Sequence, residues 1–150
     1  MRAVIQRVSN AEVSIQGVIK GSIKEGLMIL IGIEEADNQE DIDWISSKII
    51  QLRIFGDESG LMNKSLLDIN GNILLISQFT LFGQTRKGNR PSFIKAARPE
   101  TAIPIYEMLQ VILSEKLGKR IETGTFGANM KVSLTNDGPV TLFLDTKNKE

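Results

Sequence analysis

One run of the chain contains no polar side chain and constrains the fold most: Gly26-Leu27-Met28-Ile29-Leu30-Ile31-Gly32-Ile33. A short, continuously apolar run of this kind is typical of a strand buried on both faces. Its apolar part, Leu27–Ile33, is far shorter than the ~20 residues needed to span a bilayer. The sequence therefore predicts a core strand over residues 26–33 and no membrane segment.

Two amphipathic patterns predict helices. In the first, Asp37 is a good N-cap and Glu40 follows three residues later, which is a capping-box arrangement. A stripe of apolar residues at helical spacing continues from there, and we expect this helix to end near Phe55-Gly56. The second helix is predicted to begin near Pro99 and to end at Gly118, since proline favours the first turn and glycine the C-terminal cap.

Alternation of apolar and polar residues predicts the other strands. Residues 2–8 and 12–19 favour a hairpin around Ser9-Asn10. Asn70-Gly71 favours a two-residue type I′ turn between two strands, of which the second continues to Leu81. Three further strands are predicted at residues 119–126, 130–136 and 139–145. About seven strands and two helices indicate an α+β fold, with mostly antiparallel β-sheet and the helices packed on one side.

Composition excludes several kinds of chemistry. The 150 residues include no cysteine and no histidine, so a thiolate nucleophile, a Ser-His-Asp triad and a histidine-ligated zinc are impossible. Eighteen basic and eighteen acidic residues balance, so contact with nucleic acid should be local rather than general. No linker, repeat or signal-peptide pattern interrupts the chain, which predicts a single cytoplasmic domain over residues 1–150.

Polar side chains follow an apolar strand at Ser77-Gln78-Phe79-Thr80-Leu81. A period of two places Gln78 and Thr80 on one face. Either the strand simply leaves the core there, with both side chains in water, or the two side chains converge on a pocket at the strand end. A threonine hydroxyl in this chain lacks the histidine base that usually activates it.

A second unusual segment is Asn136-Asp137-Gly138-Pro139-Val140-Thr141. Asp-Gly between alternating strands is a hairpin signal, and Pro139 cannot donate to a ladder, so a simple tight turn accounts for it. A Gly-Pro bond between two good strands is unusual, however, and an X-Pro bond can be cis at a cost of about 0.5–1 kcal/mol. A specialised turn is the alternative.

Residues 84–98 contain five basic side chains and no acidic one: Arg86, Lys87, Arg90, Lys95 and Arg98. Such runs are often solvated surface. Phe93 and Gly88 in the same segment suit a loop that contacts phosphates around an apolar anchor. The acidic stretch at residues 34–43 is explained by helix capping better than by a metal site, and we expect no metal.

Taken together, SQFTL at Ser77–Leu81, N-x-G-P-x-T at Asn136–Thr141 and KGNRPSF at Lys87–Phe93 resemble the D-aminoacyl-tRNA deacylase family. The resemblance covers essentially the whole chain. It implies a layered β/β/α fold and a homodimer that uses neither a metal nor an organic cofactor. The implied activity is cleavage of the ester between a D-amino acid and the 3′-terminal adenosine of tRNA, a proofreading step in translation.

The resemblance also implies roles for particular residues. The strand end with Ser77, Gln78, Phe79 and Thr80 would form the catalytic floor, with Thr80 as nucleophile or water-positioning residue. The Gly138-Pro139 bond would be cis and would act as a chirality filter in the partner subunit's site. Asn136, Thr141 and Arg7 are expected to support that loop. The residues expected to bind tRNA are Arg86, Lys87, Arg90 and Lys95.

A backbone wall explains such a filter physically, because it blocks an L side chain by exclusion and needs no contact with a D side chain. It cannot exclude glycine, so hydrolysis of glycyl-tRNA is expected. With no base to activate Thr80, assistance by the substrate's 2′-OH is favoured over nucleophilic attack. A non-catalytic RNA-binding module and a plain dimerisation domain are the competing interpretations.

Overall fold

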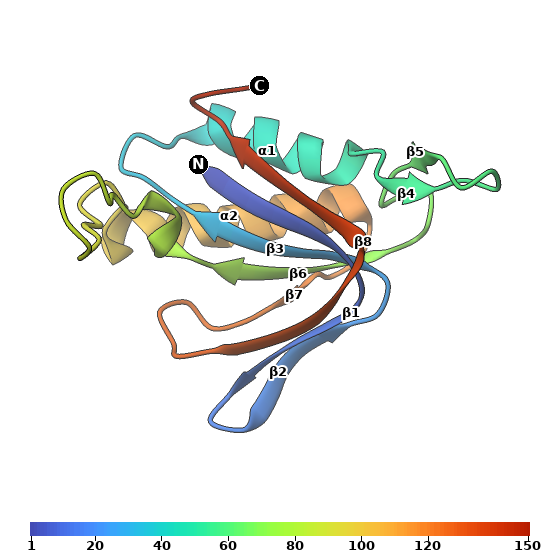
Figure 1. Cartoon of the computed structure of the whole chain (residues 1–150), viewed down its shortest axis with the longest axis horizontal. Coiled ribbons are helices and arrows are strands. Elements are labelled where there is room, and N and C mark those ends of the chain that lie inside the picture. The colour runs from blue at the N-terminus through green and yellow to red at the C-terminus, as the bar shows by residue number, and fades with distance from the viewer.

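The computed structural model describes all 150 residues. Its main sheet has six strands, and two helices cover one face of it (Figure 1). The strands of this sheet are β1 (Arg2–Ile15), β2 (Val18–Ile23), β3 (Gly26–Gly32), β6 (Asn72–Ser77), β7 (Glu122–Thr123) and β8 (Lys131–Asp145). The remaining elements are α1 (Gln39–Gln51), β4 (Phe55–Gly56), β5 (Met62–Lys64), the 3-10 turn η1 (Phe79–Phe82) and α2 (Pro99–Leu117).

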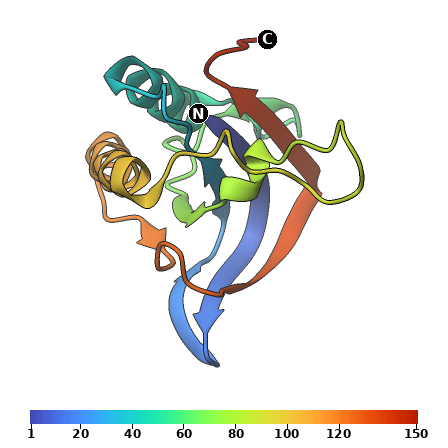
Figure 2. The ribbon, with the colours of Figure 1, turned by 90° about the vertical axis from the view of Figure 1, so that its left-hand side faces the viewer.

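Strand β3 lies in the middle of the sheet, as its apolar run predicts. Alternate side chains of β3 and β6 enter two separate hydrophobic clusters. Ile29 and Leu75 belong to the cluster under the helices, whereas Met28 and Leu74 belong to a cluster on the opposite face. Figure 2 shows α1 and α2 together on one face of the sheet. The predicted α+β fold, with both helices on one side, is confirmed.

Strand pairing follows the order β2-β1-β3-β6-β7, and β8 pairs with β1. The three pairings made by β1, with β2, β3 and β8, are antiparallel. Those between β3 and β6 and between β6 and β7 are parallel. The long strand β1 therefore organises the sheet. No helix has the length and apolar character required to cross a membrane.

Both predicted helices are present, with one displaced boundary. Helix α2 begins at Pro99 and is capped by Gly118 at φ +73°, as expected. The N-cap of α1 is Asn38 instead of Asp37, because the Asn38 side chain accepts from the Glu40 amide while Asp41 accepts from the Asn38 amide. Asp37 instead pairs with the buried terminal ammonium of Met1. The helix ends at Gln51, before the predicted limit.

Two predicted hairpins are wrong. Residues 2–15 form one strand, and the chain turns only at Gln16 and Gly17, both with positive φ. The segment before Asn70-Gly71 is a turn rather than a strand: the Gly71 amide donates to the Leu66 carbonyl at 3.0 Å. Strand β6 then pairs in parallel with β3, which buries its apolar side chains on both faces.

The three strands predicted after α2 are also corrected. Residues 119–126 contain only the two-residue strand β7, and residues 131–145 form one continuous strand. Asp137-Gly138 is consequently no hairpin turn. Both halves of β8 pair with β1, which is long enough to hold them end to end.

Candidate active site

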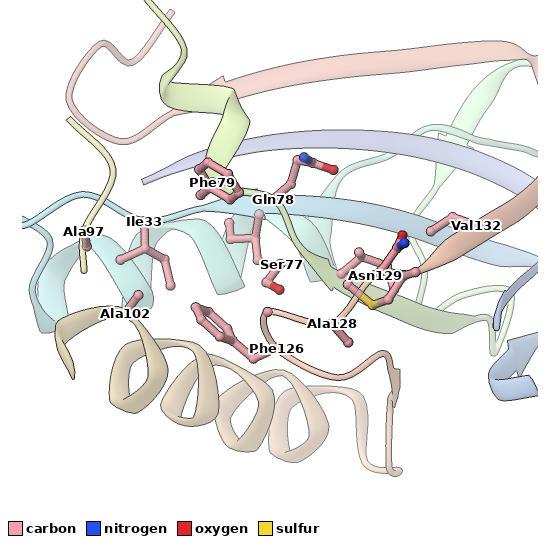
Figure 3. A pocket seen from close by; sticks show the side chains of 14 residues that line it. Ile33, Ser77, Gln78, Phe79, Ala97, Ala102, Phe126, Ala128, Asn129 and Val132 are labelled. Atoms are coloured by element: carbon pink, nitrogen blue, oxygen red, sulfur yellow. The ribbon is translucent and has the colours of Figure 1, made fainter. Parts of the chain in front are cut away.

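A cavity of about 270 Å³ opens where β6 ends (Figure 3). Ser77, Gln78 and Phe79 line it from the end of β6 and the start of η1. Ala97, just before α2, and Ala102, in its first turn, line another side, and a loop before β8 closes the opposite side. Most of the lining is apolar, and its polar side chains are those of Ser77, Gln78 and Asn129.

The segment that carries Thr80 is a 3-10 turn and not the predicted extension of the strand. Strand pairing stops at Ser77, and the Gln78 amide makes one last bond to the Ile31 carbonyl at 2.7 Å. The period-two placement of Gln78 and Thr80 is therefore wrong, yet their side chains still meet, since the Gln78 amide group donates to the Thr80 hydroxyl.

Thr80 is exposed and is not among the residues that line the cavity. Its hydroxyl oxygen accepts a hydrogen bond from the Gln78 carboxamide, which cannot take a proton from it. The first amides of a helical turn have no acceptor within that turn, so those of Phe79 and Thr80 are potential donors to an oxyanion. The arrangement favours orientation and hydrogen-bond donation over base catalysis.

Sequence reasoning missed the loop Phe126–Met130, which lines the cavity throughout. A Cβ on Gly124 would lie 2.3 Å from the Met130 sulfur, so a larger residue there would force the Met130 side chain to move. Gly127 adopts φ +74°, which favours glycine as well. Gly127, between two predicted strands, and Gly124, inside the first of them, were the available signal for a loop at this place.

Gly138 and Pro139 lie in a bulge of β8. Asn136 pairs with Val8 and Thr141 pairs with Gln6, so the four residues between them face the single residue Arg7. The Gly138–Pro139 peptide bond is cis, and both residues are exposed. The bulge therefore projects its backbone outward from the sheet.

Neighbouring side chains brace this bulge. Arg7 donates from Nε to the Asp137 carbonyl at 3.1 Å and from Nη1 to the Ile54 carbonyl at 2.6 Å. The Asn136 side chain donates to the Val140 carbonyl at 3.0 Å. Gln6 donates to the Thr141 hydroxyl at 3.3 Å. The expected supporting residues Arg7, Asn136 and Thr141 thus all surround the Gly-Pro loop.

Within one chain, the Gly-Pro loop lies away from the Ser77 side of the cavity. Ser77 is level with Ile31, which pairs with Ala3, whereas the bulge is level with Arg7. Four residues along β1 separate these levels, which is about 13 Å at the rise of a strand. Neither Gly138 nor Pro139 lines the cavity.

The basic segment, residues 84–98, forms a loop beside the cavity, as its composition indicates. Gln84 and Ser92 form an isolated bridge at its base. Phe93 packs edge-on against Phe79 with ring centroids 5.1 Å apart, so it anchors the loop next to the cavity. The predicted tRNA-binding side chains are all exposed and form no ion pair: Arg86, Lys87, Arg90 and Lys95.

Glu35 fixes the wall formed by the start of α2. Its carboxylate accepts from the Arg98 amide at 2.8 Å and from the Thr101 hydroxyl at 2.9 Å. These hydrogen bonds, the Arg98 amide first, lower the pKa of Glu35 below its ordinary value. An anion at this position also complements the positive end of the helix dipole.

Solved structures define the fold class. The solved structure of a c-Myc DNA unwinding element binding protein superposes with a TM-score of 0.90 and 40% identity, over 97% of this chain and 98% of that one. A probable eukaryotic D-amino acid tRNA deacylase shares the fold at a TM-score of 0.81, with 18% identity over 95% and 97% of the two chains.

Sequence comparison gives the family within that class. The family model described as D-Tyr-tRNA(Tyr) deacylase matches residues 4–145. D-aminoacyl-tRNA deacylases of Bacteroides thetaiotaomicron and Flavobacterium johnsoniae are 64% and 57% identical, each aligned over 100% of both chains. The chain belongs to the D-aminoacyl-tRNA deacylase family and is a hydrolase.

Proposed function

We propose that this protein hydrolyses the ester of D-aminoacyl-tRNA and spares the L ester, and so removes D-amino acids before translation. The observation that carries the proposal is the cavity where β6 ends, which joins apolar walls to the SQFTL residues and adjoins a cationic loop. Membership of the deacylase family supports the ester as the bond that is cleaved.

The cavity and the cationic loop suit two different parts of an aminoacyl-tRNA. An apolar cavity of about 270 Å³ suits the aminoacylated terminal nucleoside, because pockets for small ligands combine apolar walls with a few placed polar groups. The exposed cations of residues 86–95 suit the phosphates of the acceptor end. Phe93 ties these two surfaces together through its contact with Phe79.

The Gly-Pro loop acts, in this proposal, in the cavity of a second copy of the chain. The loop does not line the cavity of its own chain and lies about 13 Å along β1 from the level of Ser77, which supports a homodimer. An apolar row of Phe143, Val4 and Leu30 crosses β8, β1 and β3 between the two sites. Phe143 is 57% exposed there, which suits a surface covered by a partner.

The filter works by exclusion. Exposed backbone at Gly138 and Pro139, braced by Arg7 and Asn136, cannot rotate away as a side chain can. An L side chain directed at this wall collides with it, whereas a D side chain points elsewhere. Glycine has no side chain to collide, so glycyl-tRNA is a substrate in this proposal.

Catalysis relies on the substrate's own hydroxyl. The ester is already activated, and the neighbouring ribose 2′-OH assists attack by water. The amides of Phe79 and Thr80 donate to the developing oxyanion, and Gln78 orients the Thr80 hydroxyl. A mechanism that uses the substrate hydroxyl and backbone amides fits a chain that has no histidine to act as a base.

The test is a deacylation time course on matched D-tyrosyl-tRNA, L-tyrosyl-tRNA and glycyl-tRNA. We expect rapid loss of the D and glycyl esters while the L ester decays at its spontaneous rate. Loss of both tyrosyl esters would keep the hydrolase and remove the filter. RNA binding without loss of any ester would support a binding module instead, and inert glycyl-tRNA would contradict the exclusion mechanism.

A further inference from the structure

A row of residues crosses three strands at the level of the cavity. Arg2 on β1 pairs with Asp145 on β8 at one side and with Gly32 on β3 at the other. Directly opposite residues in a ladder present their side chains on the same face of the sheet. The 3-10 turn η1 lies against the Gly32 end of this row.

Gly32 provides the space in which the turn sits. A Cβ at this position would lie 3.1 Å from the Gln78 carbonyl oxygen and equally close to Leu81 and Phe82. The turn is therefore in close contact with the backbone of β3. Phe82 is fully buried as a result, while Phe79 and Thr80 remain exposed at the other side of the same turn.

Arg2 holds the far end of the turn through two different contacts. Its Nη1 donates to the Leu81 carbonyl at 3.0 Å, and its guanidinium carbon lies 4.6 Å from the centroid of the Phe82 ring. Asp145 fixes the guanidinium in turn, by accepting from Arg2 Nε at 2.9 Å. Arg2 is 31% exposed and Asp145 only 11%, so this ion pair is partly shielded from water.

We propose that Arg2 is a positioning residue for the catalytic turn and that Asp145 orients it. The near end of η1 is already fixed by the bond from the Gln78 amide to Ile31. Arg2 fixes the far end, so the turn that carries the Phe79 and Thr80 amides is held at both ends. The consequence for catalysis rests on the deacylase function proposed above; the consequence for the turn does not.

Only arginine satisfies these contacts together. Its planar fork donates in two directions and stacks on an aromatic ring, whereas a lysine ammonium is a single point charge. Burial raises the pKa of Asp145, but hydrogen bonds from the Lys147 amide and Arg2 outweigh it, so the net pKa of the carboxyl is lowered. The pair is therefore charged throughout the neutral range.

The experiment compares Arg2→Ala, Arg2→Lys and Asp145→Asn with the control Arg53→Ala. Arg53 also donates to a loop carbonyl, that of Asn63 at 2.8 Å, but it lies away from the cavity. We expect Arg2→Ala to lower kcat on D-tyrosyl-tRNA at least tenfold with KM within about twofold, because the interaction acts on the reacting geometry. Arg2→Lys and Asp145→Asn should fall between wild type and Arg2→Ala.

A second measurement does not depend on activity. Hydrogen exchange of the bonded amides of the turn, those of Gln78, Leu81 and Gly83, should rise at least tenfold in Arg2→Ala and in Arg2→Lys, and should be unchanged in Arg53→Ala. Unchanged exchange, or a kcat equal to that of Arg53→Ala, overturns the proposal. If the wild type hydrolyses no ester, the deacylase function fails while the exchange result still decides whether Arg2 holds the turn.

Discussion

Arg7 reaches across to the bulge of β8, where its Nε lies 3.1 Å from the carbonyl oxygen of Asp137 and 3.4 Å from the carboxylate of the same residue. Its Nη1 donates to the Ile54 carbonyl at 2.6 Å. The guanidinium is thus fixed on one side by the chain after α1 and on the other by the residue before Gly138. Loss of this side chain frees the loop without touching the cavity.

Arg7→Ala should therefore weaken the choice between D and L esters. We expect the ratio of their hydrolysis rates to fall about tenfold or more, which corresponds to about 1.4 kcal/mol of discrimination. Parallel time courses on D- and L-tyrosyl-tRNA measure it. Arg53→Ala, which removes a guanidinium bonded to another loop, is the control. An unchanged ratio in Arg7→Ala would falsify the bracing role.

Thr80→Ala tests how the ester is attacked. If the substrate 2′-OH assists water, the variant should keep activity within about tenfold of wild type, since only one hydroxyl contact to Gln78 is lost. Single-turnover hydrolysis of D-tyrosyl-tRNA measures this, with Thr135→Ala as an exposed threonine elsewhere. Complete loss of hydrolysis with the fold and tRNA binding intact would instead identify Thr80 as the nucleophile.

Gly138→Ala should disturb the loop in two ways. Gly138 adopts φ +126°, where an L side chain is strained, and a Cβ would lie 2.9 Å from Arg7 Nη2. Gly60→Ala is matched, because Gly60 has φ +78° with open space around it. Both variants should lose about 1–2 kcal/mol in the free energy of unfolding. Only Gly138→Ala should lower the D-to-L rate ratio; equal ratios would argue against a filter at this position.

Removing positive charge from the basic loop should weaken tRNA binding uniformly. The variants Arg86→Ser, Lys87→Ser, Arg90→Ser and Lys95→Ser should each raise KM for D-tyrosyl-tRNA and lower the salt slope of binding by about 1 per lost phosphate contact. A free 3′-aminoacyl adenosine lacks those phosphates, so its hydrolysis should not change. Lys24→Ser, at the opposite end of β3, controls for net charge. A salt slope identical in all five variants would exclude the loop from the interface.

Acid should destabilise the fold partly through Asp41. Burial raises the pKa of this carboxyl, but hydrogen bonds from Lys147, Thr146 and the Asn38 amide outweigh it and lower the pKa from 3.8 to about 2. The folded state thus prefers the ionised carboxylate, whose stabilisation is complete above about pH 4 and is lost as the pH falls toward 2. Denaturant unfolding at several pH values should show this loss. Asp41→Asn should flatten it, whereas Asp43→Asn, on the exposed side of α1, should not.

The sequence predicted those elements whose signals are local. The apolar run of β3 and the Pro99–Gly118 limits of α2 are confirmed, since burial on both faces and helix capping are properties of the segment itself. The Asn70-Gly71 signal correctly marks a turn, in which Asn70 adopts φ +50°, but Gly71 lacks the positive φ that the predicted type I′ turn requires. The hairpin was nevertheless wrong, since the partner of β6 is selected by burial against β3, far away in the chain.

The candidate site shows the same difference between local signals, which the sequence reveals, and contacts between distant segments, which it does not. SQFTL and the Gly-Pro segment could be recognised as unusual, but their separation by about 13 Å depends on both halves of β8 pairing with one long strand. The Phe126–Met130 wall was missed because its role comes from the cavity it encloses and not from any reactive group. Residues that only shape a cavity carry no reactive group, so a sequence pattern gives little indication of their role.

The pairing of β1 with β8 also governs when the protein can finish folding during its synthesis. Arg2 pairs with Asp145, which lies 143 residues later, so one whole edge of β1 stays open until β8 has left the ribosome. Contacts of such long sequence separation form slowly, and an open strand edge is prone to pair with other chains. Every nascent copy therefore passes through a stage in which one edge of β1 is unpaired, and the sheet is completed only after β8 has been made.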